Sequence, residues 1–184
     1  KCVYWTIGIA EAATIWANNW PSAPRSSQIL SNLMIQGSAN DLYLTPLSVT
    51  GMALITLGTA LRVRCYQVMK SLFTFDLSIR ESHRLVRTGP YSVVRHPSYS
   101  GILMVYIGMV CWFGSRGSWL RESGVLETQG GKRFFGIFGT VMGAIMVGLL
   151  GRMSAEDGAL RKRFGDEWVA YAHDVPYSII PHVY

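Results

Sequence analysis

Arg95 and His96 stand side by side in the stretch GPYSVVRHPSYSG, residues 89–101, immediately before a long apolar run. A proline disfavours helical backbone at the residue before it, so we expect Pro97 to begin a helix and His96 to lie outside it. Backbone N–H groups and the positive dipole end at a helix N-terminus favour an anionic ligand. The pair therefore suggests a binding corner for a negatively charged group.

A second pair of charged residues, Arg152 and Glu156, follows another apolar run. Four residues apart on a helix, the two side chains would share one face. Charge beside lipid is costly and tends to be functional, although an ordinary helix ion pair contributing a few tenths of a kcal/mol is the open alternative. No third ligand joins His83 and His96 at a spacing typical of a metal site, so no metal is expected.

The elements that position these residues are predicted to be membrane helices. The chain of 184 residues is 49% hydrophobic and only 15% charged, against about a quarter charged in soluble domains. Four windows are long and apolar enough to cross a bilayer, namely 2–20, 42–61, 98–115 and 134–151. Window 2–20 contains Glu11 but lacks the basic start of a signal peptide, so we interpret it as a span. The fold class expected is an all-α integral membrane protein with about four transmembrane helices and a C-terminal amphipathic helix.

Lysine and arginine are unevenly divided between the connecting segments. Segment 62–95 holds seven of them and the tail after residue 151 holds four, whereas 18–41 holds one and 116–133 holds four. The positive-inside rule places 62–95 and the tail in the cytosol. The two segments that carry the candidate residues, 73–99 and 152–184, are thus predicted to lie on one side of the membrane and to build one site.

Local patterns predict the backbone of these segments. Residues 72–81 alternate apolar and polar, which is typical of an extended stretch. Thr88-Gly89-Pro90 predicts a helix start, with Tyr91 and Arg95 one turn apart on the same short helix.

The tail shows a helical pattern of its own. Apolar residues recur at helical spacing in one face, formed by Met153, Leu160, Phe164, Trp168, Tyr171 and Val175. This face predicts an amphipathic helix resting on the headgroups. The proline-containing end after residue 175 should run extended along the protein or the membrane. Gly139 and Gly143 form a GxxxG motif that permits close helix packing.

Two motifs together resemble the isoprenylcysteine carboxyl methyltransferase family. They are HRLVRTGPYSVVRHPSYSG, residues 83–101, and R-x3-E-D-x2-L-x3-FG-x-EW-x2-Y, residues 152–171, in the family's order and separated by a helical hairpin. The resemblance covers roughly the C-terminal two-thirds of the chain and implies a single transmembrane methyltransferase domain over residues 1–184. Asp157 stands where the family often has a second glutamate, and no role is assigned to it.

The resemblance also implies cofactor and residue roles. S-adenosylmethionine would be bound by His83, Arg84, Leu85, Val86, Tyr91, His96, Pro97, Ser98, Tyr99 and Glu156. Arg152 would face the substrate carboxylate, and Arg95 would orient the site or assist that carboxylate, which makes Arg152, Arg95 and Glu156 the candidate catalytic residues. No GxGxxG loop is present, so the cofactor is not expected in a doubly wound fold.

The implied activity is methyl esterification of the C-terminal carboxylate of isoprenylated cysteine, in prenylated CaaX-type proteins or small prenylcysteines. The expected location is an integral membrane position in the endoplasmic reticulum, with the site facing the cytosol and no nucleic-acid partner. One alternative is a membrane methyltransferase for a phospholipid amine or another small lipophilic acceptor. The other is a non-enzymatic protein whose basic face binds anionic lipid.

Overall fold

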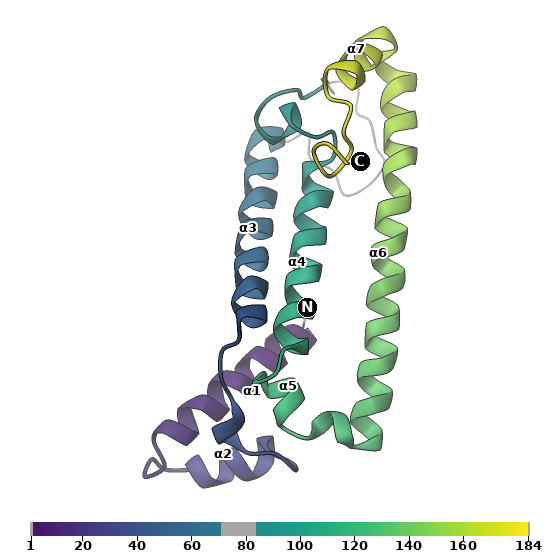
Figure 1. Cartoon of the computed structure of the whole chain (residues 1–184). Coiled ribbons are helices and arrows are strands. Elements are labelled where there is room, and N and C mark those ends of the chain that lie inside the picture. The colour runs from purple at the N-terminus through teal and green to yellow at the C-terminus, as the bar shows by residue number, and fades with distance from the viewer. Residues whose placement is uncertain (1, 71–83, 184) are drawn as a thin grey trace. The chain divides into compact units, whose positions relative to one another are not determined.

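The structure is a computed structural model that describes residues 2–70 and 84–183 (Figure 1). Within those ranges the chain forms α-helices, short 3-10 helices and loops, which confirms the all-α prediction. The extended stretch predicted at 72–81 lies outside the described residues. The chain divides into two compact units, the first made of 1–53 and 107–142 and the second of 54–106 and 143–184. The single methyltransferase domain stays a prediction.

Among the described residues, three helical stretches are long and apolar enough to cross a membrane: 46–69, 97–122 and 129–164. They comprise α3 (Pro46–Met69), α4 (Pro97–Gly114) with the short α5 (Trp119–Glu122), and α6 (Gln129–Phe164). They contain the predicted spans 42–61, 98–115 and 134–151 almost entirely. Large apolar side chains such as Ile137 and Val147 on α6 are exposed, as expected where a helix meets lipid. The protein is therefore an integral membrane protein.

The first predicted span, 2–20, is also helical and forms α1 (Cys2–Asn19). It is not among the three stretches that pass the length and hydropathy criteria for crossing a membrane. The exposed face of α1 carries Trp5, Ile9 and Trp16. The total of four spans, and the side of the membrane that each loop faces, stay predictions.

The first unit packs α1 against α2 (Ser26–Leu33), η1 (Ala39–Asp41) and α5, and η4 (Val125–Glu127) packs against α5. Its core consists of Ile7, Ala10 and Trp119. The indole N–H of Trp119 donates to the Leu33 carbonyl oxygen at 3.1 Å, which ties α5 to the end of α2.

In the second unit, glycine allows α3 and α4 to approach closely. A Cβ at Gly58 would lie 2.7 Å from the Gly101 carbonyl oxygen, and one at Gly101 would lie 2.8 Å from the Gly58 oxygen. In the first unit Gly51 has the same relation to Gly108, at 2.7 Å. Sequence reasoning did not use these glycines, although Gly51 and Gly58 are seven residues apart on α3, and Gly101 and Gly108 are seven residues apart on α4.

The helix predicted from Thr88 to Arg95 is shorter than expected. A 3-10 helix, η3 (Gly89–Ser92), begins at the predicted place but ends before Arg95. Tyr91 and Arg95 therefore do not share a helical face, and that prediction was wrong. The backbone N–H groups of Arg95 and His96 donate instead to carbonyl oxygens of the C-terminal segment.

The tail also differs in its helix boundary. α6 continues without interruption from the apolar span to Phe164, and the amphipathic pattern is broken at Gly165, whose φ is 54°, before α7 (Asp166–Asp174). The apolar positions of the pattern are all at least partly buried in the second unit. Among the described residues the GxxxG motif makes no close helix contact at Gly139, because a Cβ there would meet nothing within 4 Å. The alternative use of the motif, as a dimer face, stays a prediction.

Candidate active site

The corner predicted at Arg95 and His96 is present. α4 begins at Pro97, which is fully buried, and His96 lies just outside the helix. The backbone N–H of Arg95 donates to the Tyr177 carbonyl oxygen at 2.9 Å, and that of His96 donates to the Ser178 oxygen at 2.8 Å. The C-terminal segment therefore satisfies the donors at the entry to α4.

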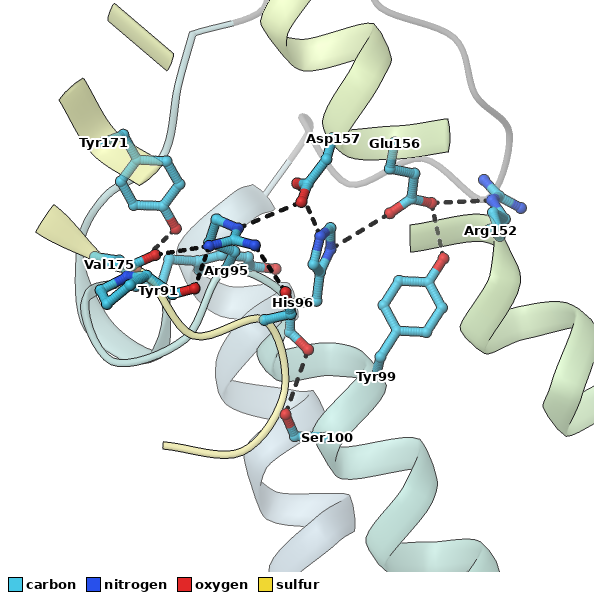
Figure 2. Close-up of polar contacts among 12 residues, drawn as sticks. Tyr91, Arg95, His96, Tyr99, Ser100, Arg152, Glu156, Asp157, Tyr171 and Val175 are labelled. Atoms are coloured by element: carbon cyan, nitrogen blue, oxygen red, sulfur yellow. Dashed lines mark hydrogen bonds and ion pairs between the residues drawn. The ribbon is translucent and has the colours of Figure 1, made fainter. Parts of the chain in front are cut away.

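The imidazole of His96 lies between two carboxylates of α6 (Figure 2). Its Nε2 is 2.9 Å from Asp157 Oδ1 and its Nδ1 is 3.7 Å from Glu156 Oε2. The side chain of His96 is only 6% exposed. A buried imidazole held by an acidic residue on each side has a fixed ring plane.

Glu156 also connects the two predicted segments directly. The Tyr99 hydroxyl donates to Glu156 Oε1 at 2.8 Å, and Arg152 Nε donates to the same oxygen at 2.9 Å. Tyr99 and Glu156, 57 residues apart in sequence, are thus in contact. The Arg152–Glu156 pair is the i,i+4 pair predicted from spacing, and Tyr99 adds a contact that an isolated helix ion pair would not have.

The guanidinium of Arg95 binds the C-terminal segment and α6 at once. Nε donates to Asp157 Oδ2 at 3.3 Å, whereas the two Nη atoms donate to three acceptors of the C-terminal segment. These acceptors are the Val175 oxygen at 3.1 Å, the Pro176 oxygen at 2.5 Å and the Ser178 hydroxyl at 2.7 Å. All three guanidinium nitrogens of Arg95 therefore donate to protein acceptors.

Two tyrosines join η3 to its neighbours. The Tyr91 hydroxyl donates to Met69 Sδ at 2.8 Å, and the Tyr171 hydroxyl donates to the Tyr91 carbonyl oxygen at 2.8 Å. Burial raises the pKa of the Tyr171 phenol to about 12, against the opposing charge of Arg95. Burial also raises the pKa of Tyr91 above its usual value. Both phenols are therefore protonated donors at neutral pH.

Asp157 lies beyond the predicted span 134–151 and is ionised at neutral pH. Burial by itself would raise the pKa of this carboxyl, but the hydrogen bond and charge of His96, together with Arg95, outweigh it and lower the pKa. Asp157 is the site residue that sequence reasoning left without a role. The signals that pointed to it were the adjacent Glu156 and the second glutamate that the resembled family often has at this position.

The other predicted cofactor residues are less closely tied to this cluster. Arg84 is exposed, and Leu85 and Val86 are half-buried. The Ser98 carbonyl oxygen accepts a hydrogen bond from Arg62 Nη1 at 3.4 Å. His83 lies outside the described residues. Arg87 forms an ion pair with Glu167 at 3.2 Å and lies over the Tyr171 ring.

Comparisons with known proteins point to a family of membrane methyltransferases. Residues 47–121 match the family model described as phospholipid methyltransferase. Over 131 residues the chain is 30% identical to protein-S-isoprenylcysteine O-methyltransferase B of Arabidopsis thaliana. The chain is a relative of these membrane methyltransferases. The resemblance to the isoprenylcysteine carboxyl methyltransferase family predicted from the two motifs is confirmed.

Each match covers only part of the chain, which limits the conclusions that can be drawn from it. The match to the Arabidopsis protein covers 70% of this chain and 57% of the relative, so the chain spans little more than half of that protein's length. The family model covers η3 and α4, with Arg95, His96 and Tyr99, but ends before Arg152 and Glu156. The comparisons therefore assign no role to an individual residue.

The donor set around His96 fits S-adenosylmethionine. That molecule combines a sulfonium and an ammonium with a carboxylate and a ribose diol. Glu156 offers a carboxylate acceptor, Tyr99 a phenol that donates to it, and Arg152 a guanidinium whose Nε is 2.9 Å from the same carboxylate oxygen. Within residues 2–70 and 84–183, no group of three or more His, Cys, Asp or Glu side chains is arranged to hold a metal ion.

Proposed function

We propose that the protein catalyses S-adenosylmethionine-dependent methyl esterification of the C-terminal carboxylate of isoprenylated cysteine. The observation that carries the proposal is the chain of hydrogen bonds from Tyr99 through Glu156 to Arg152, which joins the entry of α4 to the end of the α6 span. The name of the Arabidopsis relative, protein-S-isoprenylcysteine O-methyltransferase B, supports this substrate class.

The cofactor would be held at the α4 entry. Glu156 and Tyr99 would contact its ribose or ammonium group, and His96, Pro97 and Ser98 would shape the backbone beside it. Tyr91, Arg84, Leu85 and Val86 precede this corner, and with His83 they complete the set predicted to bind S-adenosylmethionine. When bound, this cofactor supplies a sulfonium methyl group: an oxygen–carbon bond forms, a sulfur–carbon bond breaks, and the ester and S-adenosylhomocysteine result.

Arg152 would bind the substrate carboxylate. Its Nε is engaged with Glu156, while its two Nη atoms form the planar fork that pairs with a carboxylate. A carboxylate is already ionised at neutral pH, so the reaction requires no general base. The protein's contribution is then to hold the carboxylate in line with the methyl group and to exclude water from it, which together contribute several kcal/mol.

Arg95 would act by orienting the site rather than by contacting the substrate. Its guanidinium already binds Asp157 and the C-terminal segment, so of the two roles predicted from sequence this geometry favours the first. Arg152 and Glu156 then remain the proposed residues in contact with the reacting groups.

The proposed setting is the endoplasmic reticulum membrane with the site facing the cytosol. The excess of lysine and arginine in 62–95 and in the tail supports the cytosolic orientation of the site. A site at the end of the apolar part of α6 allows a prenyl chain to stay in lipid while its carboxylate reaches Arg152. Prenylated CaaX-type proteins or small prenylcysteines would be the partners.

The match to the phospholipid methyltransferase model favours a second candidate, methylation of a phospholipid amine. An amine acceptor develops positive charge, which Glu156 or Asp157 would stabilise. Arg152 would disfavour this reaction, because its positive charge repels the positive charge of the methylated amine.

One experiment separates the two candidates. The purified protein in lipid nanodiscs is given S-adenosylmethionine labelled in the methyl group, with a farnesylated cysteine analogue in one arm and phosphatidylethanolamine in the other. We expect label in the cysteine arm that mild alkali releases, as a methyl ester requires. Alkali-stable label in the lipid arm alone would replace the first candidate by the second, and no label in either arm would contradict both.

A further inference from the structure

Asp157 occupies a central position that the proposed reaction does not use. Both of its carboxylate oxygens are engaged, Oδ1 with His96 Nε2 at 2.9 Å and Oδ2 with Arg95 Nε at 3.3 Å. Its side chain is 19% exposed and that of Arg95 is 15% exposed, so solvent screens this contact only partly. One carboxylate on α6 thus binds two consecutive residues at the entry of α4.

The contact with His96 determines which edge of the imidazole faces Glu156. A carboxylate accepts hydrogen bonds and donates none, so Nε2 must carry a proton in both the neutral and the charged ring. The opposite edge, Nδ1, then faces Glu156 Oε2 at 3.7 Å. Without Asp157, His96 would have a choice of tautomer and of ring orientation beside Glu156.

The contact with Arg95 extends this constraint to the C-terminal segment 175–179. Arg95 holds that segment through the oxygens of Val175, Pro176 and Ser178. Carbonyl oxygens of this segment also accept hydrogen bonds from the backbone N–H groups of Arg95 and His96. In addition, Ser100 Oγ donates to the Ile179 oxygen at 2.6 Å. Asp157 therefore fixes the guanidinium that fastens the end of the chain over the entry of α4.

We propose that Asp157 is a positioning residue that fixes the tautomer and orientation of His96 beside Glu156 and, through Arg95, seats segment 175–179 on the α4 entry. A carboxylate that orients an imidazole in this way supports a neighbouring binding group without touching the ligand. The consequence for cofactor affinity rests on the proposed function, whereas the effect on His96 does not.

The first test examines the ligand-free protein. With ¹⁵N-histidine labelling in detergent micelles, the His96 resonance is assigned by its loss in His96→Gln. In the wild type we expect a protonated Nε2 whose hydrogen exchanges slowly. Asp157→Ala should lose this protected signal, while Asp166→Ala, an exposed aspartate at the start of α7, should keep it. An unchanged His96 signal in Asp157→Ala overturns the proposal.

The second test measures affinity for S-adenosylhomocysteine by calorimetry. We expect Asp157→Ala to weaken binding by about tenfold or more, as the loss of a buried hydrogen-bonded charge implies. In a His96→Ala background the same substitution should cost less affinity than in the wild type, because only its contact with Arg95 remains to be lost. Full additivity of the two effects, or wild-type affinity in Asp157→Ala, would overturn the positioning role.

Two further variants keep the tests decisive. Asp157→Asn has the same size but can accept from only one of its two partners, so it reports on function if the alanine variant does not fold. Asp157→Glu keeps the charge and should lie between wild type and alanine. If the wild type itself binds no S-adenosylhomocysteine, the proposed function fails, and the His96 resonance still decides whether Asp157 positions the ring.

Discussion

The two units of the protein place a carboxylate among aromatic and apolar groups in different ways. In the first unit, Glu11 of α1 accepts a hydrogen bond from the indole N–H of Trp112 at 3.2 Å, a neutral donor. In the second unit, Glu156 and Asp157 contact Arg152, Arg95 and His96. One acid with a neutral partner can anchor a helix, whereas neighbouring acids matched by cations can bind a ligand that carries both charges.

The difference extends to the backbone. In the second unit the C-terminal segment is bound by both main-chain and side-chain donors of Arg95 and by the main chain of His96. In the first unit, α1 and α4 are joined by the hydrogen bond from the Trp112 indole to Glu11. A dense network of this kind restricts side-chain orientation and is what an active site needs for preorganisation.

The largest effect that this comparison predicts concerns Arg152. Arg152→Ala should lower methyl transfer by on the order of 100- to 1,000-fold, because the group that orients the substrate carboxylate is removed. Arg152→Lys should also be severely impaired, since an ammonium does not reproduce the planar fork. Labelled-methyl turnover in nanodiscs measures both, alongside a size-exclusion profile that checks folding.

Arg161→Ala is the matched control, because Arg161 is an exposed arginine farther along the same helix. It should retain wild-type turnover. Near-normal turnover in Arg152→Ala would mean that the C-terminal part of α6 does not belong to the active site. Wild-type kinetics in Arg152→Lys would mean that the reaction does not require a bidentate pair with the carboxylate.

Sequence patterns sufficed for the helices and for the corner at Pro97. Apolar windows located α3, α4 and α6, and the restriction that Pro97 places on His96 set the start of α4. The contact between Tyr99 and Glu156 joins segments far apart in sequence. It was expected only from the order of two family motifs and from the positive-inside rule, because no local pattern encodes which loops meet.

The remaining features depend on tertiary contacts that leave little trace in sequence. The helix predicted through Arg95 stops at Ser92, and the N–H groups of Arg95 and His96 bind carbonyl oxygens of the tail, which any residue type can supply. The break in the tail helix at Gly165 was not predicted, and the positive φ of this residue shows why glycine stands there. Asp157 was passed over because its partners are fixed only by the fold.

The next effect concerns the packing of α3 against α4, which should affect stability in both units but ligand binding only in the second. Gly51→Ala and Gly58→Ala each place a methyl group 2.7 Å from a carbonyl oxygen of α4. Each should lower stability by about 1–3 kcal/mol, as overpacking does. Only Gly58→Ala presses on Gly101, next to Ser100 and the bound C-terminal segment. It should therefore also weaken S-adenosylhomocysteine binding several-fold.

Thermal unfolding in detergent and calorimetric titration measure the two quantities for each glycine variant. Equal losses of affinity in Gly51→Ala and Gly58→Ala would show that packing along α3 acts on the site regardless of position. Loss of stability without any loss of affinity in Gly58→Ala would mean that the entry of α4 tolerates displacement.

The smallest effect is expected at Glu11. Glu11→Gln keeps an oxygen that accepts from the Trp112 indole, so stability should change by no more than about 0.5 kcal/mol. Glu11→Ala loses the acceptor and leaves the indole N–H without it, which should cost about 1 kcal/mol. Neither should alter methyl transfer, whereas Glu156→Gln, which removes the charge that faces Arg152, should lower it strongly. Turnover and thermal unfolding of the three variants test this, and a loss of activity in Glu11→Gln would show that the carboxylate of the first unit also takes part in function.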